Sequence, residues 1–88
     1  MKSNFLKVMI IDNEIQYHEG YRYYFETYTD YVLTGIYTSV KEALLDFNSF
    51  MPDIIVSEVA IPDIGGIDSI RHFRKLDKEV KIIMLSAD

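Results

Sequence analysis

The chain has 88 residues, 49% hydrophobic and 26% charged, which is the composition of one small globular domain and excludes a disordered chain. Its net charge of −5, with nine scattered basic residues, argues against a nucleic-acid-binding surface, which needs clustered lysines and arginines. Without cysteine it has neither disulfides nor thiolate metal sites. There is no apolar run of ~20 residues and no secretory signal, so we expect a cytoplasmic domain without membrane contact.

The first part of the sequence predicts a strand, a helix and a second strand. The apolar run at residues 5–11 is rich in β-forming residues, which predicts a strand covered on both faces. Residues 15–28 carry aromatic side chains at helical spacing, which predicts a helix with one buried face: Tyr17, Tyr21, Tyr24, Phe25 and Tyr28. Residues 31–37 predict the next strand.

A second helix follows. Ser39 with Glu42 three residues later forms a capping-box signature for its start, and Pro52 marks its end. The apolar positions between them predict a buried stripe: Val40, Ala43, Leu44, Phe47 and Phe50 or Met51.

The remaining elements continue the alternation. Residues 53–57 predict a third strand that runs into Glu58, residues 66 or 67 to 76 a third helix, and residues 80–85 a fourth strand. Strands that alternate with helices through short connections predict an α/β fold, in which helices cover both faces of a parallel sheet.

Ligands of such sheets bind beyond the carboxyl ends of the strands. Asp12 and Glu58 occupy such ends on strands that would be neighbours if the strand order reverses between them. Two carboxylates there could hold a divalent cation, and Ser86 after the next strand could donate a hydrogen bond to an anion above them. The alternative is that these polar residues only mark the solvent-exposed ends of strands.

The segments KVMIIDNE, EGYRYYFE, SVKEALLDF, PDIIVSEVAIPDIGGIDSIRHFR and VKIIMLSAD together cover almost the whole chain. In their order and spacing the sequence resembles the receiver domain of two-component response regulators, and EGYR is most similar to regulators with a LuxR-type helix-turn-helix output. The resemblance implies a flavodoxin-like, doubly wound sheet with strand order 2-1-3-4-5 and transient phosphorylation of an aspartate. Residues 1–88 would supply four strands and three helices, in the order 2-1-3-4.

The resemblance also implies roles for individual residues. The family's acidic pair falls on Asp12 and Asn13, its phosphoacceptor aspartate on Glu58 and its switch hydroxyl on Ser86. The implied magnesium site is Asp12, Asn13, Glu58 and the backbone carbonyl of Ala60. We expect a weakened affinity for Mg²⁺, because Asn13 is an amide where the family has an acid. Pro62 and Gly66 match the loop after the acceptor.

Glu58 is one methylene longer than aspartate, which displaces the attacking oxygen by roughly an ångström, and misplacement of that order costs ~10²-fold in rate. We therefore expect phosphorylation at Glu58 to be weak or absent. Two interpretations of Glu58 stay open: a silent site, or a fixed charge that imitates part of a phosphoryl group.

The family's fourth helix, fifth strand with its lysine, and fifth helix have no counterpart here, so we expect residues 1–88 to be the N-terminal portion of a receiver domain. Its partners would be a sensor histidine kinase and a second copy paired along the exposed fourth strand. DNA would be contacted only through an absent output domain.

The resemblance implies a signalling module, so we do not expect an enzyme. The alternative function is a small metal-dependent phosphotransferase or hydrolase that uses Asp12 and Glu58, and a nucleotide-binding fragment is weaker because no glycine-rich loop follows the first strand. We expect His18 and His72 to be surface or helix-face residues. Asp63 and Asp68 are expected to serve turn and helix-start chemistry.

Overall fold

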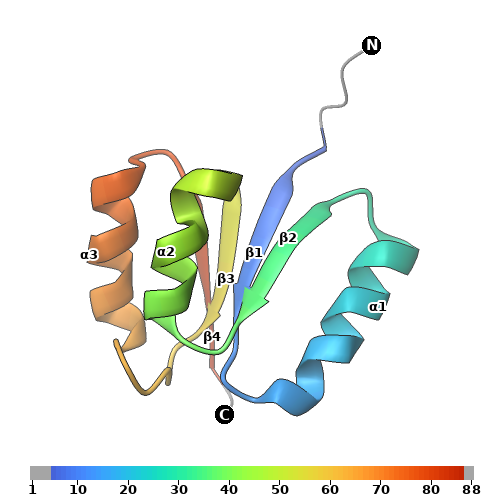
Figure 1. Ribbon diagram of the computed structural model, residues 1–88, viewed down its shortest axis with the longest axis horizontal. Helices are drawn as coiled ribbons and strands as arrows, with labels where there is room; N and C mark the ends of the chain where they lie inside the picture. The colour runs from blue at the N-terminus through green and yellow to red at the C-terminus, as the bar shows by residue number, and fades with distance from the viewer. Residues whose placement is uncertain (1–4, 87–88) are drawn as a thin grey trace.

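The strands of this chain form one parallel sheet (Figure 1). The computed structural model describes residues 5–86 and contains β1 (Lys7–Ile11), β2 (Val32–Tyr37), β3 (Ile54–Glu58) and β4 (Lys81–Leu85). They pair in the order β2-β1-β3-β4, which confirms the predicted fold class and strand order. In Figure 1 the strands run downward, so their carboxyl ends meet at the lower edge of the sheet.

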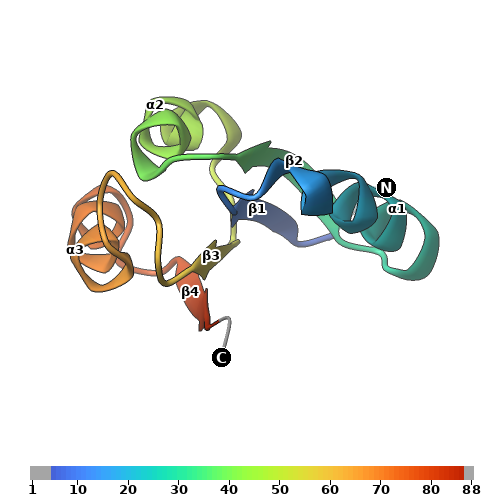
Figure 2. The same ribbon diagram turned by 90° about the horizontal axis from the view of Figure 1, so that it is seen from below.

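Helices cover both faces of this sheet. A short 3₁₀ turn, η1 (Ile15–Tyr17), leads into α1 (His18–Tyr28), and α2 (Val40–Phe50) and α3 (Gly66–Leu76) follow. Helices α2 and α3 lie on one face and α1 lies on the other (Figure 2). No helix within residues 5–86 has the length and apolar character needed to cross a bilayer.

The predicted boundaries are correct to within one or two residues, apart from the first helix, which opens with the 3₁₀ turn. The first strand begins at Lys7, because Phe5 and Leu6 precede the sheet and are exposed by 55% and 42%.

The core lies between the sheet and the pair α2 and α3. Its buried members are Met9, Ile11, Val40, Ala43, Phe47, Ile55, Ile61, Phe73 and Val80. The rings of Phe47 and Phe73 join the two helices with their centroids 5.6 Å apart. The stripe predicted for α2 is confirmed at its start and wrong at its end, where Phe50 and Met51 are exposed by 41% and 66%. Met51 is the C-cap of α2 and turns the chain out of the helix with a φ of 48°.

The aromatic face predicted for the first helix is buried only in part, since Tyr21 and Phe25 are half-buried. Tyr17, Tyr24 and Tyr28 are 54%, 54% and 66% exposed. Helix α1 lies beside β1 and β2, and among the described residues nothing covers its far side (Figure 2). Its aromatic rings contact one another instead, with the centroids of Tyr24 and Tyr28 5.7 Å apart. The periodicity correctly identified an apolar face, but a periodic face does not reveal what covers it.

The start of α2 agrees with the capping prediction in part. The Ser39 hydroxyl accepts the Glu42 backbone N–H at 3.2 Å, as an N-cap does. The Glu42 carboxylate accepts a hydrogen bond from the Thr38 hydroxyl at 3.3 Å, so it does not complete a reciprocal capping box.

Candidate functional site

The residues selected from the sequence gather at the carboxyl edge of the sheet. Ile11 pairs with Ser57, so Asp12, which follows β1, lies beside Glu58, the last residue of β3. Glu58 in turn pairs with Leu85, and Ser86 follows it directly. Asp12, Glu58 and Ser86 therefore come from three adjacent strands, as expected from the rule for parallel sheets. We call Asp12, Asn13, Glu14 and Glu58 the acid pocket.

Asp12 is buried, with 2% of its surface exposed, and each oxygen of its carboxylate accepts a hydrogen bond. One oxygen, Oδ1, accepts the backbone N–H of Glu14 at 2.9 Å. The other, Oδ2, accepts the phenol of Tyr21 at 2.8 Å. A buried carboxylate needs such donors, because an unpaired charge away from water is costly.

The turn between β1 and α1 is organised around the same residue. Nε2 of His18 donates to the Asp12 carbonyl at 2.7 Å, and the Asp12 backbone N–H donates to the Tyr37 carbonyl at 2.8 Å. His18 is 9% exposed and is the first residue of α1, so of the two expected placements the helix-face one is confirmed and the surface one is wrong. His72 on α3 is exposed, as expected.

Sequence reasoning missed the link between Tyr21 and Asp12 because it assigned Tyr21 to a buried stripe. The available signal was spacing: His18 and Tyr21 are three residues apart and therefore share the helix face that follows Asp12. Burial, the hydrogen bond to Asp12 and the charge of Asp12 raise the pKa of Tyr21 to about 12. The phenol therefore keeps its proton at neutral pH and acts as a donor.

The Glu58 carboxylate has acidic neighbours. Burial raises the pKa of Glu58 above its ordinary value, and the charges of Asp12 and Glu14 raise it further. Between described residues the one ion pair joins Arg71 to Asp68 at 3.9 Å, on the exposed side of α3. No ion pair in this part of the chain therefore offsets the charge of Glu58.

These residues do not fit a divalent cation as they are arranged. Mg²⁺ requires nearly octahedral oxygen ligands at about 2.0–2.1 Å. Here one lone pair on each Asp12 oxygen is taken by a hydrogen bond, and Asn13 offers a neutral amide in place of a second acid. Within residues 5–86 no three histidine, cysteine or acidic side chains are grouped so that they could hold a metal ion. Ala60 is exposed in the turn after β3, where its backbone carbonyl contributes no charge.

Hydrogen bonds hold the loop after Glu58 to the start of α2 and to Val59, the residue that follows β3. Asp63 accepts the backbone N–H groups of Val40 and Lys41 at 3.1 and 2.9 Å, so it caps the start of α2. Its expected role in helix-start chemistry is therefore correct, but it acts on a helix distant in sequence.

The Gly66 N–H donates to the Val59 carbonyl at 2.9 Å, and a Cβ on Gly66 would lie 2.9 Å from the Val59 backbone. Asp68 lies in the first turn of α3.

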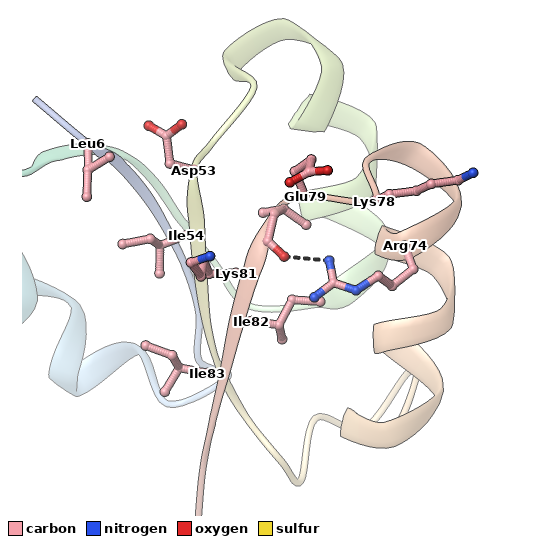
Figure 3. A pocket seen from close by; sticks show the side chains of 10 residues that line it. Leu6, Asp53, Ile54, Arg74, Lys78, Glu79, Lys81, Ile82 and Ile83 are labelled. Atoms are coloured by element: carbon pink, nitrogen blue, oxygen red, sulfur yellow. Dashed lines mark hydrogen bonds between the residues drawn. The ribbon is translucent and has the colours of Figure 1, made fainter. Parts of the chain in front are cut away.

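A surface groove of about 730 Å³ lies at the other end of the sheet, along the start of β4 (Figure 3). Its lining combines apolar Leu6, Ile54 and Ile83 with charged residues such as Arg74 and Lys81. The Arg74 guanidinium donates to the Val80 carbonyl across it. No residue of the acid pocket lines this groove, so it represents the open flank of β4 and is separate from the acid pocket.

Comparison with known proteins identifies a family for almost the whole chain. Residues 8–88 match the model of the response regulator receiver domain. The chemotaxis protein CheY of Thermotoga maritima is 34% identical over 61 residues, which are 69% of this chain and 51% of that protein. The response regulator VraR of Staphylococcus aureus is 26% identical over 82 residues, or 93% of this chain and 39% of that protein. The chain thus spans about half or less of the curated relatives it matches.

Solved structures agree with this match. A LuxR-family two-component response regulator from Aurantimonas sp. SI85-9A1 superposes with a TM-score of 0.85 and 27% identity, over 97% of this chain and 61% of that one. RcsB of Salmonella typhimurium superposes with a TM-score of 0.85 over 98% of this chain and 44% of that one. The identity to RcsB is 17%, so that likeness concerns the fold alone.

Proposed function

This chain belongs to the response regulator receiver domain family, and we propose that its acceptor position, Glu58, takes up little or no phosphoryl group. Receiver domains are the signal-receiving modules of two-component systems. The observation that carries the proposal is the position of Glu58 at the end of β3, directly beside Asp12. By the resemblance this is where the family has its acceptor aspartate.

The position of the attacking oxygen of Glu58 supports the proposal. Phosphoryl transfer depends above all on the alignment of the attacking oxygen with the donor. The extra methylene of Glu58 displaces that oxygen by roughly an ångström, and a displacement of this order costs ~10²-fold in rate.

The negative charge around Glu58 also supports weak or absent phosphorylation. A phosphoryl donor brings further negative charge to a pocket that already holds Asp12, Glu14 and Glu58. The pKa of Glu58 is raised by burial and by these neighbours, and no ion pair within the described residues offsets the charge. Like charges brought together in a partly buried site oppose one another, so approach of the donor is unfavourable.

Beryllofluoride, with magnesium in the buffer, tests this proposal because it imitates a phosphoryl group on an acceptor carboxylate. We expect the amide NMR spectrum of the wild-type chain to stay unchanged around Asp12, Glu58 and Ser86. The matched variants are Glu58→Asp and Asn13→Asp/Glu58→Asp, and we expect shifts to appear at these residues in the double variant. Large saturable shifts in the wild-type chain would overturn the proposal.

We further propose that the parent protein is a DNA-binding transcriptional regulator controlled by a sensor histidine kinase. This is supported by the similarity to VraR and to the LuxR-family regulator. RcsB, which shares the fold, has been solved as a DNA complex. DNA binding would belong to a part of the parent outside the matched region, because this chain is acidic with a net charge of −5.

The outer edge of β4 supports self-association of the 88-residue chain with a second copy. Among the described residues β4 pairs with β3 alone, and Ile83 on it is 48% exposed (Figure 3). Two β4 strands paired antiparallel about Ile83 would place Lys81 opposite Leu85, so no like charges would meet. Unpaired apolar edges of this kind recruit other strands.

Sedimentation equilibrium tests this association. We expect a dimer for the wild-type chain and a monomer for Ile83→Lys. The control is Ile67→Lys, which places the same charge on an apolar residue of α3 that is 69% exposed and should leave the dimer intact. A folded, monomeric wild-type chain would contradict the proposal.

A further inference from the structure

Tyr21 is the one side chain among the described residues that donates a hydrogen bond to the carboxylate of Asp12. It reaches from the second turn of α1 to Oδ2 at 2.8 Å, while the backbone of Glu14 holds Oδ1 at 2.9 Å. The contact is partly buried, and Asp12 itself is 2% exposed. Water therefore has little access to replace the phenol.

This hydrogen bond competes directly with a cation. A metal ion bound to Oδ2 would share that oxygen with the phenolic proton, which draws electron density from the same atom and so weakens its bond to the cation. A hydrogen bond to a charged group corresponds to about tenfold to a hundredfold in an equilibrium constant. The hydrogen bond from Tyr21 also stabilises the carboxylate of Asp12 without a cation, which reduces the free energy gained when a cation binds.

We propose that Tyr21 is a positioning residue that acts as an internal ligand of Asp12 and weakens the binding of divalent cations at the acid pocket. The proposal rests on the proposed function, since it assumes that the acid pocket corresponds to the receiver site. It adds a further cause of weak cation binding. Asn13 and Glu58 change two of the ligand positions, whereas Tyr21 donates a hydrogen bond to the remaining acid, Asp12. Asp12 thereby serves as the anchor of the β1–α1 turn, through Glu14, His18 and Tyr21.

The matched control is Tyr37, the other tyrosine whose phenol donates to a carboxylate in the described part of the chain. Its phenol contacts Asp46 at 2.7 Å, and burial followed by that hydrogen bond raises the pKa of Tyr37 to about 12. Tyr37→Phe therefore removes the same kind of hydrogen bond on the α2 side of the sheet, where no acid-pocket side chain takes part.

The experiment measures Mn²⁺ affinity by electron paramagnetic resonance and Mg²⁺ affinity by amide NMR. The background is Asn13→Asp/Glu58→Asp, which restores carboxylates at the other ligand positions. We expect Tyr21→Phe to raise the affinity of this background about tenfold to a hundredfold. Tyr37→Phe should leave it unchanged, and the wild-type chain should show no saturable binding.

Equal affinities for the background with and without Tyr21→Phe, or equal gains from Tyr21→Phe and Tyr37→Phe, would overturn the proposal. Urea denaturation of each variant verifies that it is folded, so a loss of structure is distinguished from a change in affinity. Failure of the proposed function would appear differently, as beryllofluoride shifts in the wild-type chain. The two claims can therefore fail separately.

Discussion

Asp63→Ala tests how the loop after Glu58 is held. The Asp63 carboxylate accepts the N–H groups of Val40 and Lys41 at 3.1 and 2.9 Å, and Val40 itself is fully buried. Replacing a helix cap by alanine costs about 0.5–2 kcal/mol. Because two N–H groups lose a charged acceptor here, while Asp63 is exposed enough for water to substitute in part, we expect a loss of about 1–2 kcal/mol. For a domain of this size that lowers Tm by about 5–15 °C.

The assay is urea and thermal unfolding followed by circular dichroism, with Asp68→Ala as the matched control. Asp68 takes part in an exposed ion pair at 3.9 Å, so its replacement should cost less than about 0.5 kcal/mol.

Partial burial acts to raise the pKa of Asp63, but backbone N–H groups of Lys41 and Val40 outweigh it and hold that pKa below its ordinary value. The stabilisation is thus present at neutral pH and is lost as the pH falls through the lowered pKa. If Asp63→Ala unfolded at the same urea concentration as Asp68→Ala, the capping argument would be refuted.

Two further predictions concern the same edge of the sheet. Glu58→Gln should raise the unfolding midpoint at neutral pH, because burial and the charges of Asp12 and Glu14 raise the pKa of Glu58, so ionising it destabilises the folded chain. The gain should vanish as the pH falls through that raised pKa, and a less stable variant at neutral pH would count against the reasoning. Gly66→Ala should lower the free energy of unfolding by about 1–3 kcal/mol in urea titrations, because the added Cβ would lie 2.9 Å from the Val59 backbone. An unchanged free energy of unfolding would mean that the loop relaxes freely.

The sequence predicted the sheet because its signal is local and repeated. Apolar β-forming runs, helical periodicity, Ser39 as a cap and Pro52 as a stop each act over a few residues, and together they permit few topologies. The meeting of Asp12 and Glu58 followed from the topology alone, since parallel strands bring their carboxyl ends to one edge.

What the sequence did not reveal depends on contacts between distant side chains. Asp63 caps a helix that begins at Val40, and nothing in its local sequence specifies that partner. The aromatic face of α1 has the period of a buried stripe, yet Tyr24 is 54% exposed because α1 covers only part of the sheet. Tyr21 differs from Tyr24 solely in its position on that helix, which brings its hydroxyl within 2.8 Å of Asp12.

The central claim is that Glu58 stands at a receiver acceptor position and does not accept phosphate there. Intact-mass spectrometry after incubation with acetyl phosphate and magnesium tests it most directly, with the wild-type chain and the Asn13→Asp/Glu58→Asp variant side by side. We expect no phosphoryl adduct on the wild-type chain and a measurable fraction on the variant. A wild-type adduct localised to Glu58 at the level of the variant would contradict the account.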